Sequence, residues 1–222
     1  MKLNVLVAAA TAAVALSASN ALAVSVDFTR ITSNSSADAA AQLVLDVTDG
    51  GNGALFTFSV LDGANPGASI AEIYFEDSNS LFSSVSLFSQ SAGVSYEVGT
   101  VNPTNLPGRN NATPPFAHTD DLVAQADGDN ATGVGVGEEL VLNLIYASLS
   151  IGFQDVLDAL EAGDLRVGLH VRSLLAGESD AFVSLPPDGD NSTVVPVPAA
   201  GLLLLSGIAG LGFVRRRRRT AA

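Results

Sequence analysis

The sequence has no cysteine, no tryptophan and few basic residues. Without cysteine, the chain cannot hold disulfides, thiolate zinc sites or iron–sulfur clusters, and it has no cysteine nucleophile. A chain of this kind must therefore be stabilised by its core, with bound ions as the remaining aid. The lack of tryptophan removes a large aromatic side chain suited to stacking, which argues mildly against a sugar-binding surface.

Positive charge is scarce in the middle of the chain. The whole sequence has 23 acidic residues against 10 basic ones, and six of the basic residues lie close to the two ends. The four that remain are arginines: Arg30, Arg109, Arg166 and Arg172. Because all 23 carboxylates lie between Asp27 and Asp190, four arginines against 23 carboxylates give that part a formal charge of −19. Such a domain repels nucleic acid and anionic lipid, so we expect no nucleic acid partner.

The first 23 residues are typical of a secretory signal peptide. Lys2 gives a positive start, residues 3–16 are almost entirely apolar, and Ala21 and Ala23 form an Ala-x-Ala cleavage site. We predict a signal peptide over residues 1–23 and a mature protein that begins at Val24. An uncleaved membrane anchor is the alternative.

The C-terminal part combines a proline motif, an apolar segment and a basic end. The motif is Val195, Pro196, Val197, Pro198 and Ala199, and the basic end is Arg215, Arg216, Arg217, Arg218 and Arg219. A helix over residues 199–214 spans roughly 24 Å at ~1.5 Å per residue, and arginine stems can extend its reach towards the ~30 Å of a bilayer core. The arginines should stay on the cytoplasmic side, so the preceding chain lies outside the inner membrane.

This order of features resembles the VPLPA-CTERM variant of the PEP-CTERM sorting signal, although Val197 stands where leucine is usual. In that family, exosortase, a membrane-embedded cysteine transpeptidase, recognises the signal. The resemblance implies cleavage at the proline motif, loss of the tail and transfer to the cell surface or extracellular matrix, in association with exopolysaccharide and biofilm. It covers residues 195–222 only. A tail anchor that is never cut is the alternative.

Residues 24–186 are predicted to form a mainly β domain, an acidic antiparallel β-sandwich that is jelly-roll-like. Apolar and polar residues alternate in many short segments separated by glycine turns, which indicates roughly eight to ten strands. The clearest segments are 24–31, 41–48, 55–61, 71–76, 139–147, 165–172 and 181–185. A glycine-rich turn at 49–53 predicts a hairpin.

Three segments depart from this alternation. Apolar residues recur with helical spacing over 153–161, and Gly163 follows, so one short helix is expected there. Residues 102–118 contain four prolines and are predicted to be a long surface loop. Residues 187–194 are predicted to be a linker.

Two groups of residues could carry chemistry. Arg166, His170 and Arg172 alternate on one predicted strand, so they share a face. They could bind an anionic ligand, or they could pair with carboxylates on neighbouring strands. The run from His118 to Asp121 could hold a metal, or it could be an ordinary surface loop.

Calcium is the one cofactor that the sequence suggests. Asp127, Asp129 and Asn130 form an oxygen-rich turn outside the pattern of an EF-hand. A similar run at 188–191 lies in the predicted linker.

No nucleophile elbow, phosphate loop or zinc-binding helix occurs in the sequence. We therefore expect an exported, non-enzymatic protein, held first at the inner membrane and then at the cell surface or in the matrix. Its expected partners are an exosortase-like transpeptidase and exopolysaccharide. A calcium-assisted carbohydrate-binding module is the second hypothesis, and a secreted hydrolase is the third.

Overall fold

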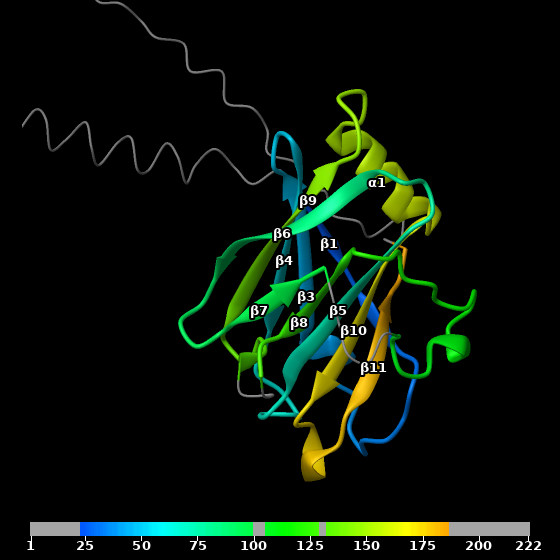
Figure 1. Cartoon of the computed structure of the whole chain (residues 1–222). Coiled ribbons are helices and arrows are strands. Elements are labelled where there is room, and N and C mark those ends of the chain that lie inside the picture. Colours follow the sequence, from blue (N-terminus) through cyan, green and yellow to red (C-terminus); the bar gives the residue numbers. More distant parts are fainter. Residues whose placement is uncertain (1–22, 100–104, 129–131, 187–222) are drawn as a thin grey trace, which may run out of the picture. The chain divides into compact units, whose positions relative to one another are not determined.

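The computed structural model describes residues 23–99, 105–128 and 132–186, which form a β-sandwich (Figure 1). The predicted signal peptide except Ala23, the linker over 187–194 and the sorting signal over 195–222 lie outside the described residues. Within the described part, no helix is long and apolar enough to cross a membrane.

Eleven strands and one α-helix make up the described part, with three short 3₁₀ turns. The strands are β1 (Ala23–Val26), β2 (Phe28–Arg30), β3 (Leu43–Asp49), β4 (Gly53–Val60), β5 (Ser69–Asp77), β6 (Phe82–Gln90), β7 (Tyr96–Val98), β8 (Val123–Ala126), β9 (Glu139–Tyr146), β10 (Leu165–Arg172) and β11 (Asp180–Ser184). The helix is α1 (Phe153–Ala162), and the 3₁₀ turns are η1 (Ala40–Gln42), η2 (Arg109–Asn111) and η4 (Leu175–Gly177).

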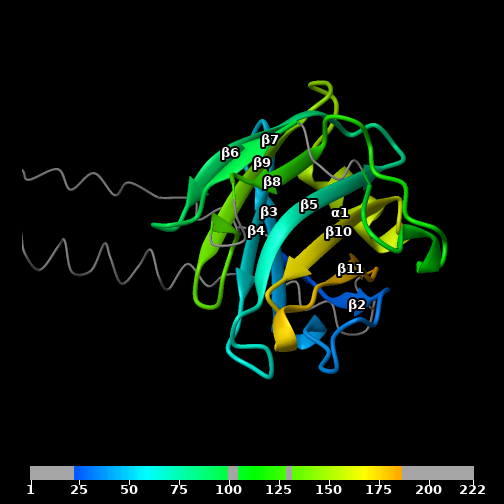
Figure 2. The ribbon, with the colours of Figure 1, turned by 60° about the horizontal axis from the view of Figure 1, so that its bottom comes forward.

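The strands form two antiparallel sheets, which confirms the predicted fold class. The five-stranded sheet has the order β1-β3-β4-β9-β6, and the six-stranded sheet has the order β2-β11-β10-β5-β8-β7. The predicted hairpin joins β3 to β4 across the turn at 49–53. Strands far apart in sequence are neighbours in both sheets, as in β4–β9 and β5–β10. Figure 2 shows β5, β10, β11 and β2 side by side.

Aromatic residues join the two sheets at the centre of the core. Phe56 on β4 meets Phe75 on β5 edge to face, with ring centroids 5.1 Å apart, and both rings are fully buried. Phe58 and Phe82 pack against the same pair at 6.2 and 6.1 Å. Edge-to-face pairs of this kind add stabilisation beyond the burial of their surface. Since the chain has no cysteine for a disulfide, this packing cluster is a principal contact between the two sheets.

The first predicted strand is divided between the two sheets. The sequence predicted one strand over 24–31, whereas β1 pairs with β3 in one sheet and β2 pairs with β11 in the other. The alternation continues across the break, because Val24, Val26 and Phe28 all point into the same core. Alternation of apolar and polar residues shows which side chains are buried. It does not show which of the two sheets a residue belongs to.

The predicted helix is confirmed as α1. Val156 and Leu160 on one face of the helix are buried in the main core. The Gly152 N–H donates to the Asp155 carboxylate at 2.8 Å, which satisfies one donor at the start of the helix. Gly163 ends the helix at φ +75°, in the left-handed region that glycine tolerates best. Figure 1 shows α1 beyond the end of β9.

The proline-rich segment is not a plain surface loop. Its described part, from residue 105 onward, covers the outer face of the six-stranded sheet and buries Leu106 and Phe116 in a second apolar cluster. Gly168 on β10 permits this close approach. A Cβ atom at position 168 would lie 2.7 Å from Leu106 Cδ2 and 2.9 Å from Phe116 Cζ. The prediction treated prolines as a sign of exposure and missed the apolar residues between them.

The proline-rich segment also buries side chains of β5 that alternate with its apolar residues. The alternation over 71–76 predicted one polar, exposed face, but Glu72 and Tyr74 are fully buried.

The short strand β8 was not predicted, because its four residues lie between a loop and a turn and show little alternation. It pairs with β5 and extends the six-stranded sheet to β7.

Asp180 ties the start of the sandwich to its last strand. Its buried carboxylate accepts hydrogen bonds from Thr32 Oγ1 at 2.8 Å, from Asn34 N at 2.7 Å and from Ser35 N at 3.1 Å. Arg30 Nη1 lies 3.6 Å from the same carboxylate. Several donors and one cation together make burial of this charge favourable.

We predict that Gly168 and Phe116 are energetically coupled. Gly168→Ala should destabilise the protein by about 1–3 kcal/mol, because the new methyl group overpacks against the rigid Phe116 ring. Phe116→Ala alone should cost about 3–5 kcal/mol. In the double variant the Phe116 ring is gone and only the flexible Leu106 side chain remains close to the new methyl group. The double variant should therefore cost at least ~0.5 kcal/mol less than the sum of the two single costs. Urea unfolding of the four proteins measures this, and strict additivity would contradict the packing described here.

Candidate functional site

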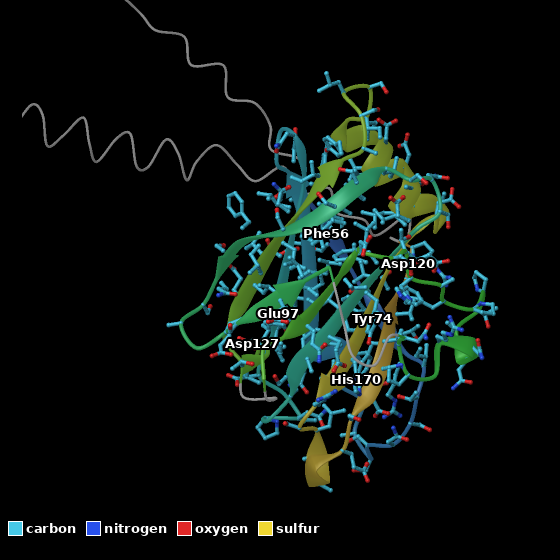
Figure 3. All side chains as sticks on the ribbon, in the orientation of Figure 1. Phe56, Tyr74, Glu97, Asp120, Asp127 and His170 are labelled. Carbon is cyan, nitrogen blue, oxygen red and sulfur yellow. The ribbon has the colours of Figure 1, made fainter. Side chains whose placement is uncertain are left out.

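Polar and charged side chains form a row across the outer face of the six-stranded sheet. Register places Glu97 of β7 beside Gln125 of β8, Gln125 beside Glu72 of β5, and Glu72 beside His170 of β10. Figure 3 labels Glu97, Tyr74 and His170 along these strands. The row crosses four neighbouring strands. Of the predicted group of Arg166, His170 and Arg172, it contains His170.

Glu72 is the centre of this row. It is fully buried, and its two carboxylate oxygens contact His170 Nδ1 and the Arg172 guanidinium. The pairing of β5 with β10 shifts by one residue just beyond Glu72, between His170 and Val171. Of the two interpretations of the alternating group, pairing with carboxylates on a neighbouring strand is the one observed.

Arg166 makes a second charged cluster on the same face. Its Nη2 lies 2.5 Å from Glu76 Oε2, and its guanidinium donates to the carbonyl oxygens of Pro114 at 2.8 Å and Pro115 at 2.9 Å. The guanidinium carbon also lies 5.5 Å from the centre of the Phe116 ring. Arg166 therefore fixes the proline-rich segment onto the sheet.

A pocket of about 290 Å³ lies beside Arg166, between the proline-rich segment and the end of β11. Polar residues in its lining include Thr29, Thr113, Asp164 and Ser184. Arg166 Nε is buried and has no hydrogen-bond partner within the described residues. A hydroxyl or carbonyl oxygen is the kind of group that could accept from it.

Tyr74 connects the row to the loop that covers it. Burial, and secondarily the charge of Glu72, raise the pKa of the Tyr74 hydroxyl well above its ordinary value. Its ring meets the His118 ring edge to face at 5.6 Å. The hydroxyl therefore remains protonated at any physiological pH and can act only as a neutral hydrogen-bonding group.

The second group from the sequence, His118 to Asp121, is chiefly structural. Thr119 N–H donates to the Phe75 carbonyl at 2.7 Å, and Thr119 Oγ1 accepts from Asp77 N–H at 2.9 Å. His118 Nε2 lies 3.9 Å from Asp120 Oδ1, and the Asp120 side chain is fully exposed. These contacts fasten the segment to β5. In the part of the chain that the structure describes, no group of three or more metal-ligating side chains comes together.

The calcium turn stays a prediction. Asp127 is exposed, its N–H donates to the Ser95 carbonyl at 2.8 Å, and its own carbonyl accepts from Thr132 Oγ1 at 2.7 Å. Asp129 and Asn130 lie outside the described residues. The backbone around Asp127 is therefore held in place while its carboxylate faces solvent.

The charges of the two clusters around Glu72 and Arg166 are largely balanced. Arg166 neutralises Glu76, and Glu72 is shared between Arg172 and His170. Glu72 fixes Nδ1 of the imidazole, which is how a carboxylate orients a histidine base. The arrangement can orient and stabilise, and it presents no excess positive charge to an anion.

Sequence reasoning found the arginines and His170 but missed Glu72, Tyr74 and Gln125. A signal was present, because Glu72 and Glu76 share one face of their strand, just as Arg166, His170 and Arg172 share one face of theirs. Two strands with complementary alternating charges are good candidates for neighbours.

Comparison with protein-family models, with curated proteins and with solved structures finds no match for this chain.

We predict that Glu72 is the main electrostatic support of this face. Glu72→Gln should destabilise the fold by about 3 kcal/mol, near the lower end for a broken buried pair, because the partly exposed Arg172 can turn towards water. Glu97→Gln is the matched control in the same row, and its cost should stay within about 0.5 kcal/mol because Glu97 is exposed. Thermal unfolding of both variants measures this. Equal effects would show that the pairing contributes little.

The tyrosines provide a test of burial that depends on pH. Burial raises the pKa of Tyr146 to about 12 and raises those of Tyr74 and Tyr96 well above the ordinary value. Because an unfolded chain ionises near ~10, the stability from these neutral hydroxyls is complete below that pH and is lost as pH rises through the folded values. The chain has no tryptophan, so the absorbance of tyrosinate reports these residues directly. We expect the tyrosines of the folded protein to ionise at higher pH than those of the urea-unfolded protein. Coincident titration curves would contradict the burial.

Proposed function

We propose that this chain is an exported, non-enzymatic protein of the cell surface or extracellular matrix, sorted by its C-terminal signal. In this proposal the sandwich is the cargo, residues 1–23 direct export, and residues 195–222 hold the protein in the inner membrane until an exosortase-like transpeptidase cuts at the proline motif. The mature protein then acts among exopolysaccharide in a biofilm. The support for this proposal comes from the sequences of the two ends and from how little the described fold depends on them.

The observation that carries the proposal is the position of the core relative to the two signals. The first buried core residue is Val24, directly after the predicted cleavage site, and β1 still pairs with β3 through Val24, Ser25 and Val26. At the other end, β11 finishes at Ser184, well before Val195. Removal of both signals would therefore leave the strand pairing and the core intact.

The predicted linker also suits this use. An extended chain over residues 187–194 reaches roughly 26–29 Å, at about 3.3–3.6 Å per residue. That length would let a membrane enzyme reach Val195 to Ala199 without contact with the sandwich. Pro196 and Pro198 favour an extended backbone, which is the form that a processing enzyme can bind.

The test is the intact mass of the protein recovered from cells that have an exosortase. The wild-type chain should begin at Val24 and lack the arginine end. A variant with Pro196→Ala and Pro198→Ala should stay in the membrane fraction with the tail attached, because its motif is no longer held extended.

The matched control replaces the upstream pair, Pro186→Ala and Pro187→Ala, which leaves the motif unchanged and should be processed normally. A wild-type protein that keeps its arginines as the lasting form would refute the proposal. Normal trimming of the Pro196/Pro198 variant would refute the role given to the prolines.

A further inference from the structure

Strand β6 is the longest free edge of the sandwich. It lies at the end of the five-stranded sheet and pairs with β9 on one side only, with no strand paired to its other side in the described residues (Figures 1 and 2). It has nine residues, whereas the other three edge strands, β1, β2 and β7, have four, three and three. A long free edge presents unpaired backbone donors and acceptors to another strand.

The composition of this edge differs from the rest of the domain. No charged residue occurs from Ser78 to Tyr96, which is the longest uncharged stretch between Asp27 and Asp190. Strand β6 itself contains no proline, lysine or arginine, and its polar residues are serines and one glutamine. Edge strands that avoid pairing usually carry such charges or prolines.

Two large apolar side chains are exposed at the same place. Leu87 is 42% exposed and Phe88 is 62% exposed. The register of β6 against β9 shifts between Leu87 and Ser89, so Phe88 falls within this irregularity. A second register shift lies near Phe82. Between the two shifts, Ser84 to Leu87 run in regular register, and this segment offers the straight edge.

We propose that β6 is a self-association edge, on which a second copy of this chain pairs antiparallel through its own β6. Such a contact is twofold symmetric, and its centre would fall at Ser86, the middle residue of the strand. It would continue each five-stranded sheet into that of the second copy. Each copy would also cover part of Leu87 and Phe88 of the other.

The distribution of charge favours a second copy of this chain as the partner of β6, and it favours β6 as the strand where two copies meet. The domain carries 21 carboxylates and four arginines over residues 24–186, so two copies repel each other over most of their surfaces. Charges beyond about 8 Å are largely screened at physiological salt, so only charges close to the contact oppose it. On β6 there are none. A foreign strand with basic residues would find no carboxylate on β6 to pair with.

The contact is small, because one pair of nine-residue strands falls at the low end of interface sizes, below about 1,200 Å² in total. We therefore expect reversible dimers in solution that strengthen with salt as the remaining repulsion is screened. Crowding of the protein on a surface would raise the effective concentration and favour pairing further. The inference itself does not depend on the proposed function, because it concerns the sandwich alone.

The experiment combines sedimentation with single cysteines, which the cysteine-free chain makes unambiguous. The natural protein, purified from the cells that make it, should show a concentration-dependent dimer in sedimentation equilibrium. Ser86→Cys should form a disulfide-linked dimer at least about tenfold faster than Ser25→Cys, because directly opposed residues hold their Cβ atoms about 4.5–5.5 Å apart. Ser25 is the matched control, an exposed serine on β1, the opposite edge of the same sheet.

A charge exchange separates pairing from misfolding. Ser86→Glu alone and Ser86→Lys alone should each lose the dimer, because like charges then face each other at the centre. A mixture of the two should recover it, which misfolded proteins could not do. The proposal is overturned if the natural protein is a monomer at millimolar concentration, if Ser86→Cys crosslinks no faster than the control, or if the Ser86→Glu protein still dimerises.

Discussion

Burial of carboxylates in a chain with very few cations is the constraint on which this structure depends. Three of the four arginines of the sandwich lie against buried or nearly buried acids: Arg30 near Asp180, Arg166 on Glu76 and Arg172 on Glu72. A buried charge without a partner costs several kcal/mol, so each of these pairs fixes the position of a strand. Because the cations are used internally, the outside remains strongly negative. The solubility of the domain and the charge balance of its interior thus come from the same distribution of residues.

Much of this fold was predictable from alternation and turn chemistry. The hairpin at 49–53, the helix ended by Gly163 and the strand over 165–172 each follow from local patterns that the tertiary structure keeps. What the sequence could not reveal was the second layer over the six-stranded sheet. Phe116 is placed there by Gly168, more than fifty residues away, and no local period reports a contact between distant segments.

The candidate site shows the same limit. Arg166, His170 and Arg172 were found because they share one strand, whereas Glu72 was missed because its importance depends on which strand lies next to β10. Both apolar clusters are needed to explain the burial of Glu72. The inner cluster sets the spacing of the sheets, and the outer one, with Tyr74 and Phe116, excludes water from the carboxylate. A domain without disulfides thus gains a second protected layer from a segment whose described part contains no strand and only one short 3₁₀ turn.

The contacts of Asp180 join the first part of the sandwich to its last strand. Strand β2 has its partner in β11, and Thr32, Asn34 and Ser35 all donate to a carboxylate about 145 residues further along. While the chain is being synthesised or threaded from its N-terminus, that segment has nothing to close on, and contacts so distant in sequence form slowly. The segment from β2 to Ser35 therefore stays without these contacts until the last strand emerges. A chain cut short before Asp180 would lack β11, which would leave β2 without its strand partner and the six-stranded sheet open on that side.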